Sequence, residues 1–110
     1  MNRLELKALR LQLFLDVVEA ADLIGKFRPR TWEYIESGKY EIYDDVLETC
    51  SKIMQDRKSL YSALENSKEL PLYGTMANYL RDFPNRDKLD WKMYQSVVTQ
   101  LFLEEKIRLV

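Results

Sequence analysis

The stretch from Asp16 to Lys39 constrains this chain most, because it holds two short amphipathic segments joined by a tight turn. The first segment is apolar at helical spacing and reaches Gly25. After a short turn, the second segment runs from Arg28 to Gly38. Two short helices joined by a tight turn that contains Gly form a helix-turn-helix, and the second helix of this motif is the type that enters a DNA major groove. The sequence therefore predicts a binding module rather than a catalytic centre.

The composition excludes several other classes of protein. The 110 residues include no His and a single cysteine, Cys50. A zinc site and a Ser–His or Cys–His nucleophile are therefore not expected, and we predict neither an enzyme nor a bound cofactor. There is no apolar run of about 18 residues for a membrane span, and residues 1–10 lack the apolar core of a signal peptide. Because a lone cysteine suits a reducing compartment, we expect a cytoplasmic protein with no membrane partner.

The charges are distributed unevenly along the chain. The net charge of −1 is not that of a typical nucleic-acid binder. However, residues 24–40 hold four cations against two carboxylates, a net of +2. Residues 41–70 hold seven acids and four bases, a net of −3. A basic face on an acidic body is compatible with DNA binding.

Capping signals mark the first two expected helices. We expect one helix over residues 2–14 with Asn2 as its N-cap, and a second after Asp16, where Glu19 completes a capping box. Gly25 is expected to be the left-handed residue that ends the second helix. The apolar stripe expected to bury the first helix consists of Leu6, Ala8, Leu9, Leu11, Leu13 and Phe14.

A third helix is expected to begin at Arg28 or Pro29, with Trp32 and Ile35 facing the core. This leaves polar side chains on its outer face. The candidate DNA-contacting residues are Lys26, Arg28, Pro29, Arg30, Glu33, Tyr34, Ser37 and Lys39. Arginine can bind guanine through two hydrogen bonds, whereas the lysines that flank the helix are candidates for phosphate contacts. The alternative is an ordinary solvated helix face.

Two charged residues are assigned to the scaffold instead of the contact surface. Arg10 lies beside the apolar stripe of the first helix, and Glu36 follows the core residue Ile35. We predict a partly buried ion pair between them, which would set the angle of the third helix. The alternative is two independent solvated charges.

A long fourth helix is expected from Asp44 or Asp45, either of which would cap it, to about Ser67, with Met54 in its apolar stripe. The helical pattern breaks at residues 69–74. We therefore place a domain boundary there: residues 1–68 form the helix-turn-helix domain and residues 69–110 form a C-terminal region.

The C-terminal region should contain two further helices, capped by Thr75 and Asp90, and an apolar end that pairs as an edge strand. Because some 40 residues seldom form a stable core alone, we predict that its aromatic face is a homodimer interface. A ligand pocket is the alternative use of these aromatics. The predicted dimerisation residues are Trp91, Tyr94, Val98, Leu101 and Phe102.

Three pieces of the chain carry a family resemblance: Glu5–Arg10, the Pro29–Trp32 and Glu36–Lys39 segments, and Asp90–Val97. These three pieces together resemble the YdiL-like family of small regulators, which includes the anti-CRISPR-associated repressors. The segment from the first to the fourth expected helix resembles the broader lambda-repressor-like (Xre-type) helix-turn-helix, through Leu9-Arg10, Glu19-Ala20-Ala21, Ile24-Gly25 and Ile35-Glu36-Ser37-Gly38-Lys39. The resemblance covers nearly the whole chain, and the segment around Trp91 is its most specific part.

The resemblance implies a homodimeric, operator-binding repressor. It places base reading on Arg28, Pro29, Arg30 and Tyr34, and a phosphate contact on Lys39. It also supports the Arg10–Glu36 pair. The chain departs from the lambda-like pattern at Val17-Val18, where a polar residue is usual, and its inter-helix turn is one residue longer.

The predicted fold class is mainly α, with a helical C-terminal region for which α+β is the alternative. The predicted function is a transcriptional regulator that binds an inverted-repeat DNA operator as a dimer and represses its own operon. Two alternatives use the same fold: a protein-interaction module that does not read DNA, and RNA binding through the same basic face.

Overall fold

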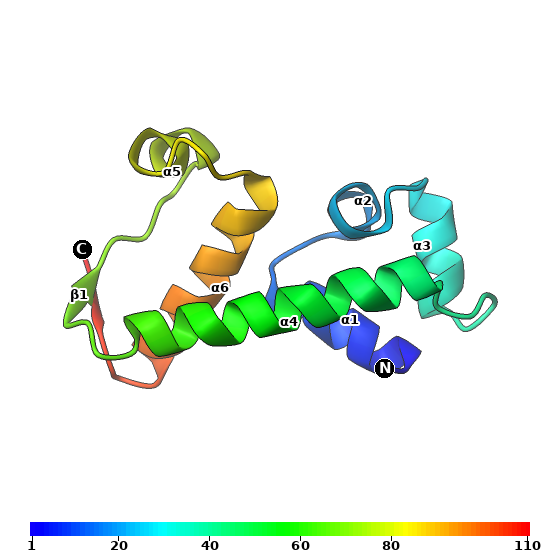
Figure 1. The fold of residues 1–110 in the computed structure, drawn as a ribbon, viewed down its shortest axis with the longest axis horizontal. Helices are drawn as coiled ribbons and strands as arrows, with labels where there is room; N and C mark the ends of the chain where they lie inside the picture. Colours follow the sequence, from blue (N-terminus) through cyan, green and yellow to red (C-terminus); the bar gives the residue numbers. More distant parts are fainter. The chain divides into compact units, whose positions relative to one another are not determined.

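The computed structural model describes all of residues 1–110 and contains two compact units, Met1–Gln55 and Asp56–Val110 (Figure 1). The chain is mainly helical, as predicted. Its elements are α1 (Arg3–Gln12), α2 (Val17–Ala20), the π-helical turn η1 (Ala21–Gly25), α3 (Pro29–Glu36), α4 (Asp44–Leu64), β1 (Glu69–Leu70), α5 (Met76–Asp82), α6 (Lys88–Leu103) and β2 (Arg108–Leu109). Helix α4 contributes residues to both units. None of the helices combines the length and the apolar character needed to cross a membrane. The functional boundary at residues 68 and 69 stays a prediction.

In the first unit, α3 packs against α1, α2 and η1. Trp32 and Ile35 of α3 are fully buried, as predicted from their spacing. The other buried apolar side chains of this unit are Leu6, Leu13, Leu15, Ala20, Ala21, Ile24, Val46, Cys50 and Ile53. A large aromatic side chain at the centre of so small a core makes the position of α3 depend on the packing of its neighbours.

The predicted N-cap of α1, Asn2, and the predicted capping box of α2 at Asp16 are both present. The Asn2 side chain accepts from the Glu5 amide at 2.9 Å, and the Glu5 carboxylate accepts from the Asn2 amide at 2.9 Å. At α2, Asp16 accepts from the Glu19 amide at 2.7 Å, and Glu19 accepts from the Asp16 amide at 3.1 Å. These contacts need only residues three apart, which explains why the sequence revealed them.

The predicted apolar stripe of α1 is wrong at its C-terminal end. The helix ends at Gln12, and Phe14 adopts a left-handed backbone conformation with φ of 57°. The chain then turns so that the Leu15 amide donates to the Arg10 carbonyl at 3.1 Å. This reversal buries Leu15 and leaves Leu11 and Phe14 exposed, as is Ala8.

The predicted left-handed end of the second helix is displaced by one residue. Lys26, not Gly25, is left-handed, with φ of 58°. The helix widens into η1 before it ends, and this wider turn accommodates the additional residue between the two helices. Gly25 is needed for a different reason: a Cβ there would lie 2.4 Å from the ring of Phe27.

The predicted cap of α4 is also wrong. Asp44 and Asp45 lie within the first turn, and the Tyr43 carbonyl accepts from the amides of Val46 at 3.0 Å and Leu47 at 3.1 Å. The two carboxylates can still stabilise the helix, because negative charges near its N-terminus interact favourably with the helix dipole. Met54, which was expected in the apolar stripe, is exposed.

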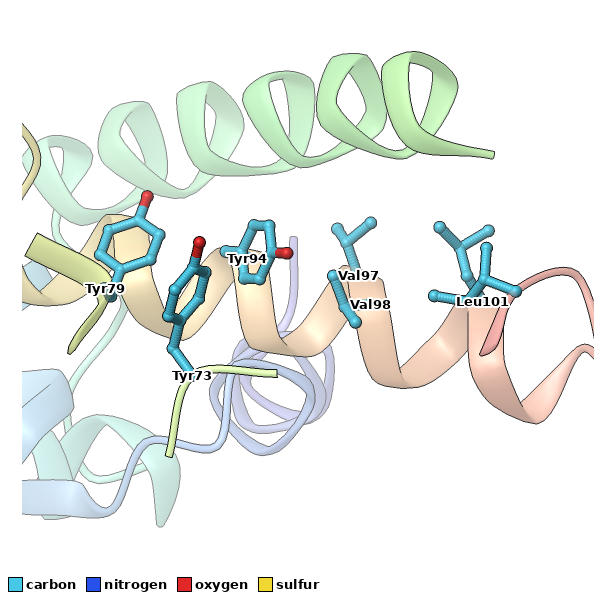
Figure 2. Packing of buried hydrophobic residues seen from close by; sticks show 7 residues of the cluster. Tyr73, Tyr79, Tyr94, Val97, Val98 and Leu101 are labelled. Carbon is cyan, nitrogen blue, oxygen red and sulfur yellow. The ribbon is translucent and has the colours of Figure 1, made fainter. Parts of the chain in front are cut away.

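The second unit has a core of its own, which Figure 2 shows along α6. Strands β1 and β2 pair in parallel, with Glu69 opposite Arg108 and Leu70 opposite Leu109, so the predicted terminal strand is confirmed. The buried cluster consists of Tyr73, Tyr79, Tyr94, Val97, Val98, Leu101 and Ile107. A segment that we expected to need a second copy therefore folds around a cluster within one chain.

One of the two predicted caps in this unit is correct. Thr75 caps α5 and accepts from the Asn78 amide at 3.2 Å. Helix α6 begins earlier than expected, because Asp87 rather than Asp90 is its N-cap. Asp90 instead accepts from the Asp87 amide at 3.1 Å and completes the capping box.

Candidate nucleic-acid interface

Helix α3 has one buried and one exposed face. Its N-cap, Arg28, has an extended backbone, and Pro29 follows at the first helical position, where a missing N–H costs no helical hydrogen bond. Trp32 points into the core, whereas Arg28, Arg30 and Glu33 are exposed. No ion pair within the chain engages the guanidinium of Arg28 or Arg30. These two side chains are therefore available to an anionic partner.

The predicted ion pair between Arg10 and Glu36 is present, and it is bidentate. Arg10 Nε donates to Glu36 Oε2 at 2.7 Å, and Nη2 donates to Oε1 at 3.0 Å. Both side chains are 11% exposed. Burial alone would raise the pKa of Glu36, but the hydrogen bonds from Arg10 and Trp32 outweigh it and hold this pKa below its ordinary value. The pair joins α1 to the last turn of α3 and so fixes the angle of the exposed face.

Two further contacts on Glu36 were not predicted from the sequence. The indole Nε1 of Trp32 donates to the Glu36 carboxylate, and Arg3 Nη1 donates to the Glu36 carbonyl at 3.3 Å. Trp32 and Glu36 are four residues apart on one helix, a spacing that places side chains together and could have revealed the first contact. Arg10 also donates to the Leu15 carbonyl at 3.0 Å. The end of α3 is therefore held by three side chains.

The residues after α3 fold back toward it. The ammonium of Lys39 lies 4.0 Å from the centroid of the Tyr34 ring, and Tyr40 meets the same ring edge-on, with 5.1 Å between centroids. Ser37 Oγ donates to the Tyr34 carbonyl at 3.0 Å. Three of the predicted contact residues, Tyr34, Ser37 and Lys39, thus form one group, to which Tyr40 adds a residue that we did not predict.

The two ends of the segment formed by α2 and η1 present different chemistry. Lys26, which follows η1, is exposed, as a phosphate contact requires. Val18, at the start of α2, is 60% exposed, and the Asp16 carboxylate caps the same helix end. The start of α2 is therefore apolar and acidic, whereas the turn before α3 carries an exposed cation.

An aromatic contact secures both connections of α3. The Phe27 ring lies 6.2 Å from the Trp32 ring and meets Tyr43 edge-on at 5.7 Å between centroids. Phe27 precedes α3 and Tyr43 precedes α4, so one aromatic group joins both loops to the core. The sequence analysis assigned no role to Phe27, although an apolar residue inside a basic turn is a signal of packing.

The predicted dimerisation residues do not share one environment. Tyr94, Val98 and Leu101 belong to the core of the second unit, and Trp91 is half-buried against it. Phe102 is 47% exposed. Because the buried members are covered by their own chain, they can affect pairing only through the shape of the unit, whereas Phe102 can reach a partner directly. Their role in dimerisation stays a prediction.

The aromatic residues of the second unit also leave open space. A groove of about 490 Å³ is lined by Tyr79, Phe83 and Tyr94, with Asp56, Arg86 and Asp90 among its polar residues. The ligand-pocket alternative for the aromatic tail therefore has a location in the fold. The groove lies in a different unit from the exposed face of α3.

The sequence matches the family described as Aca2/YdiL-like over residues 1–110. Aca2 repressor of Pectobacterium phage ZF40 is 34% identical over an alignment of 110 positions, which covers 94% of this chain and 95% of that protein. Uncharacterized protein YdiL of Escherichia coli (strain K12) is 30% identical over an alignment of 117 positions, gaps included, which covers 99% of each chain. The resemblance to YdiL-like regulators is thereby confirmed, and this chain belongs to the Aca2/YdiL-like family.

Proposed function

We propose that this protein is a sequence-specific DNA-binding repressor that acts as a homodimer. It binds an inverted-repeat operator through α3 and represses its own operon by obstructing the promoter. Arg28, Arg30, Glu33 and the first turn of α3 read base edges, whereas Lys26 and Lys39 contact phosphates.

The observation that carries this proposal is the two-faced character of α3. Trp32 and Ile35 fasten one face of the helix to the core, and the Arg10–Glu36 pair fixes its far end. The opposite face keeps its arginines exposed. A rigid helix with unpaired guanidinium groups on its first turn has the chemistry that major-groove recognition needs.

The charge of this face supports the same proposal. Glu36 is occupied by Arg10, so Glu33 is the only exposed carboxylate between residues 24 and 40. Four cations, Lys26, Arg28, Arg30 and Lys39, are exposed in that range. The relative from phage ZF40 is named a repressor, which agrees with a role in regulation.

An inverted repeat requires two copies of α3. In a symmetric dimer the two helices would enter successive major grooves about 34 Å apart. We place the pairing surface on the second unit, where Phe102 is exposed. Sedimentation velocity of the full chain measures whether it is a dimer at the concentrations used for DNA binding.

Two substitutions test the proposal on DNA from upstream of the protein's own gene. Arg30→Ala is expected to remove discrimination worth about 1–3 kcal/mol between the operator and a scrambled duplex. Lys39→Ala is expected to weaken binding to both duplexes alike and to reduce the slope of log K against log salt by about 1. Gel-shift titrations at several salt concentrations measure both effects. Equal affinity of the unmodified protein for the two duplexes at every salt concentration would refute sequence-specific reading.

A protein-interaction module is the second candidate, because Val18 is exposed and Asp16 is acidic on a face that would lie near DNA. This candidate predicts no response to any duplex and stable co-purification with a partner protein. A hairpin RNA competitor in the same titrations tests the remaining alternative, in which the basic face binds RNA.

A further inference from the structure

We propose that Tyr34 is a platform for Lys39 rather than a base-reading side chain, and that Tyr40 is a positioning residue for the same lysine. The group formed by Tyr34, Lys39 and Tyr40 is called the tyrosine–lysine stack below. It holds the Lys39 ammonium in place for one DNA phosphate. This inference rests on the proposed function, which supplies the DNA.

The backbone after α3 is built around the carbonyl of Tyr34. That carbonyl accepts from the Tyr40 amide at 3.1 Å and from Ser37 Oγ at 3.0 Å. Gly38 makes the reversal possible, because its φ of 85° lies in the left-handed region where a side chain would be strained. Lys39 is therefore returned over the helix that it follows, where its side chain stays exposed.

The side chains complete the arrangement. The Lys39 ammonium lies 4.0 Å from the Tyr34 ring centroid, well within the range of about 6 Å for a cation–π contact. Tyr40 packs edge-on against Tyr34 with an interplanar angle of 74°. A lysine side chain has many rotamers, and ordering it on binding costs conformational entropy. Because the contact with Tyr34 already orders Lys39 in the free protein, that part of the cost does not oppose DNA binding.

The stack changes the role of Tyr34. One face of its ring carries the ammonium of Lys39, and Tyr40 contacts it edge-on. A tyrosine engaged in this way contributes mainly through its ring, so its hydroxyl is not required for binding. Removing the hydroxyl and removing the ring should therefore have different effects.

The test measures binding of the full-length protein to a mixed-sequence duplex and to the DNA upstream of its gene. Tyr40→Leu and Tyr34→Leu are each expected to lower affinity for both duplexes by about threefold. Loss of one phosphate contact reduces the slope of log K against log salt by about 0.9, and each of these substitutions is expected to reduce it by less. Tyr34→Phe is expected to bind like the unmodified protein. In a Lys39→Ala background, Tyr40→Leu is expected to cause no further loss, because the group that it positions is absent.

A matched control lies in the other unit. Lys106 sits over the Tyr61 ring, with the ammonium 5.1 Å from the centroid. Tyr61→Leu removes a ring from beneath a lysine outside the candidate interface, together with the hydrogen bond that Lys106 Nζ donates to the Tyr61 hydroxyl at 2.7 Å, and is expected to leave DNA affinity unchanged. NMR of the free protein provides a second readout: the Hε protons of Lys39 should be shifted upfield by the Tyr34 ring and should return to ordinary values in Tyr34→Leu.

Three results would overturn the inference: ordinary Hε shifts in the unmodified protein, additive losses from Tyr40→Leu and Lys39→Ala, or a loss of operator affinity alone in Tyr34→Phe. The last result would return Tyr34 to base reading. If Lys39→Ala weakens binding but Tyr40→Leu does not, the stack fails and the proposed function survives. If the unmodified protein binds neither duplex, both fail.

Discussion

Each unit of this protein holds one partly buried arginine against a helix, but the two arginines meet different acceptors. Arg10 in the first unit faces the carboxylate of Glu36 in a bidentate pair. Arg57 in the second unit donates to neutral oxygens: Ser96 Oγ at 3.0 Å, the Ser96 carbonyl at 3.1 Å and Gln100 Oε1 at 2.7 Å. The pKa values follow this difference, because the hydrogen bond to Glu36 raises the pKa of Arg10, whereas burial lowers that of Arg57.

The difference shows which contacts hold each unit in its fold. A charged pair has strict geometry, and the helix that it fixes is the one with exposed arginines. Neutral acceptors stabilise a guanidinium less, but losing one of them does not create a new unpaired charge. The first unit therefore depends on one pair of residues, whereas the second depends on its aromatic core and on several weaker contacts.

The largest expected effect comes from breaking the charged pair. Glu36→Ala leaves Arg10 with the Leu15 carbonyl as its acceptor, and we expect a loss of about 3 kcal/mol in the free energy of unfolding of the first unit. The two tryptophans, Trp32 and Trp91, lie in different units. With 5-fluorotryptophan labelling, ¹⁹F NMR in a urea titration follows each unit separately.

Glu33→Ala is the control, because it removes an exposed carboxylate from the same helix. Its effect should remain within about 0.5 kcal/mol. Similar losses from the two substitutions would show that the Arg10 pair does not specify the position of α3.

A smaller loss is expected when the neutral arrangement is broken. Arg57→Met keeps most of the aliphatic stem and removes the donors, and should cost the second unit about 1–2 kcal/mol by the Trp91 signal. Ser96 Oγ retains its donation to the Met93 carbonyl at 2.7 Å, so it is not left without a partner. Lys58→Met, an exposed neighbour on the same helix, controls for the loss of charge. A cost equal to that of Glu36→Ala would remove the distinction between the two units.

The sequence predicted those parts of the fold that depend on contacts between near neighbours. The N-cap at Asn2 and the capping box at Asp16 depend on residues at most three apart, and the burial of Trp32 and Ile35 follows from the helical period. At Asp90 the same reasoning failed, because Asp87 offered an equally good cap one turn earlier. Choosing between them requires the conformation of the loop before α6, which neither capping signal specifies.

The errors in burial have a common cause. Leu11, Phe14, Met54 and Phe102 are apolar residues at or near helical spacing, yet all four are exposed. Periodicity shows that a face is apolar but not where the neighbouring elements end. The left-handed turn at Phe14, for example, gives the inward position to Leu15, and no local signal in the sequence marks that turn.

The sequence predicted which residues belong to the candidate site better than it predicted how they pack against one another. The Arg10–Glu36 pair followed from the two helical patterns together with the family resemblance, and the structure contains it. The exposed positions of Arg28 and Arg30 were also correct. The packing of Lys39 and Tyr40 on Tyr34 depends on a reversal at Gly38, so these two consecutive residues reach Tyr34 only after the backbone has turned.

The pH dependence of the charged pair is the smallest of these effects, because protonation removes the charge of Glu36 but leaves its oxygens in place. The pKa of Glu36 is lower in the folded state than its ordinary value, so the stability that it contributes is fully present above the unfolded-state pKa. That contribution is lost as the pH falls through the lower, folded-state pKa. Glu36→Gln imitates the protonated carboxyl, and we expect it to be less stable than the unmodified first unit near neutral pH and equal to it in acid. Urea titrations at a series of pH values, followed through Trp32, measure the difference between the two proteins. A difference that stays constant into acid would mean that the carboxylate charge does not hold α3, and that the shape of the residue at position 36 is what matters.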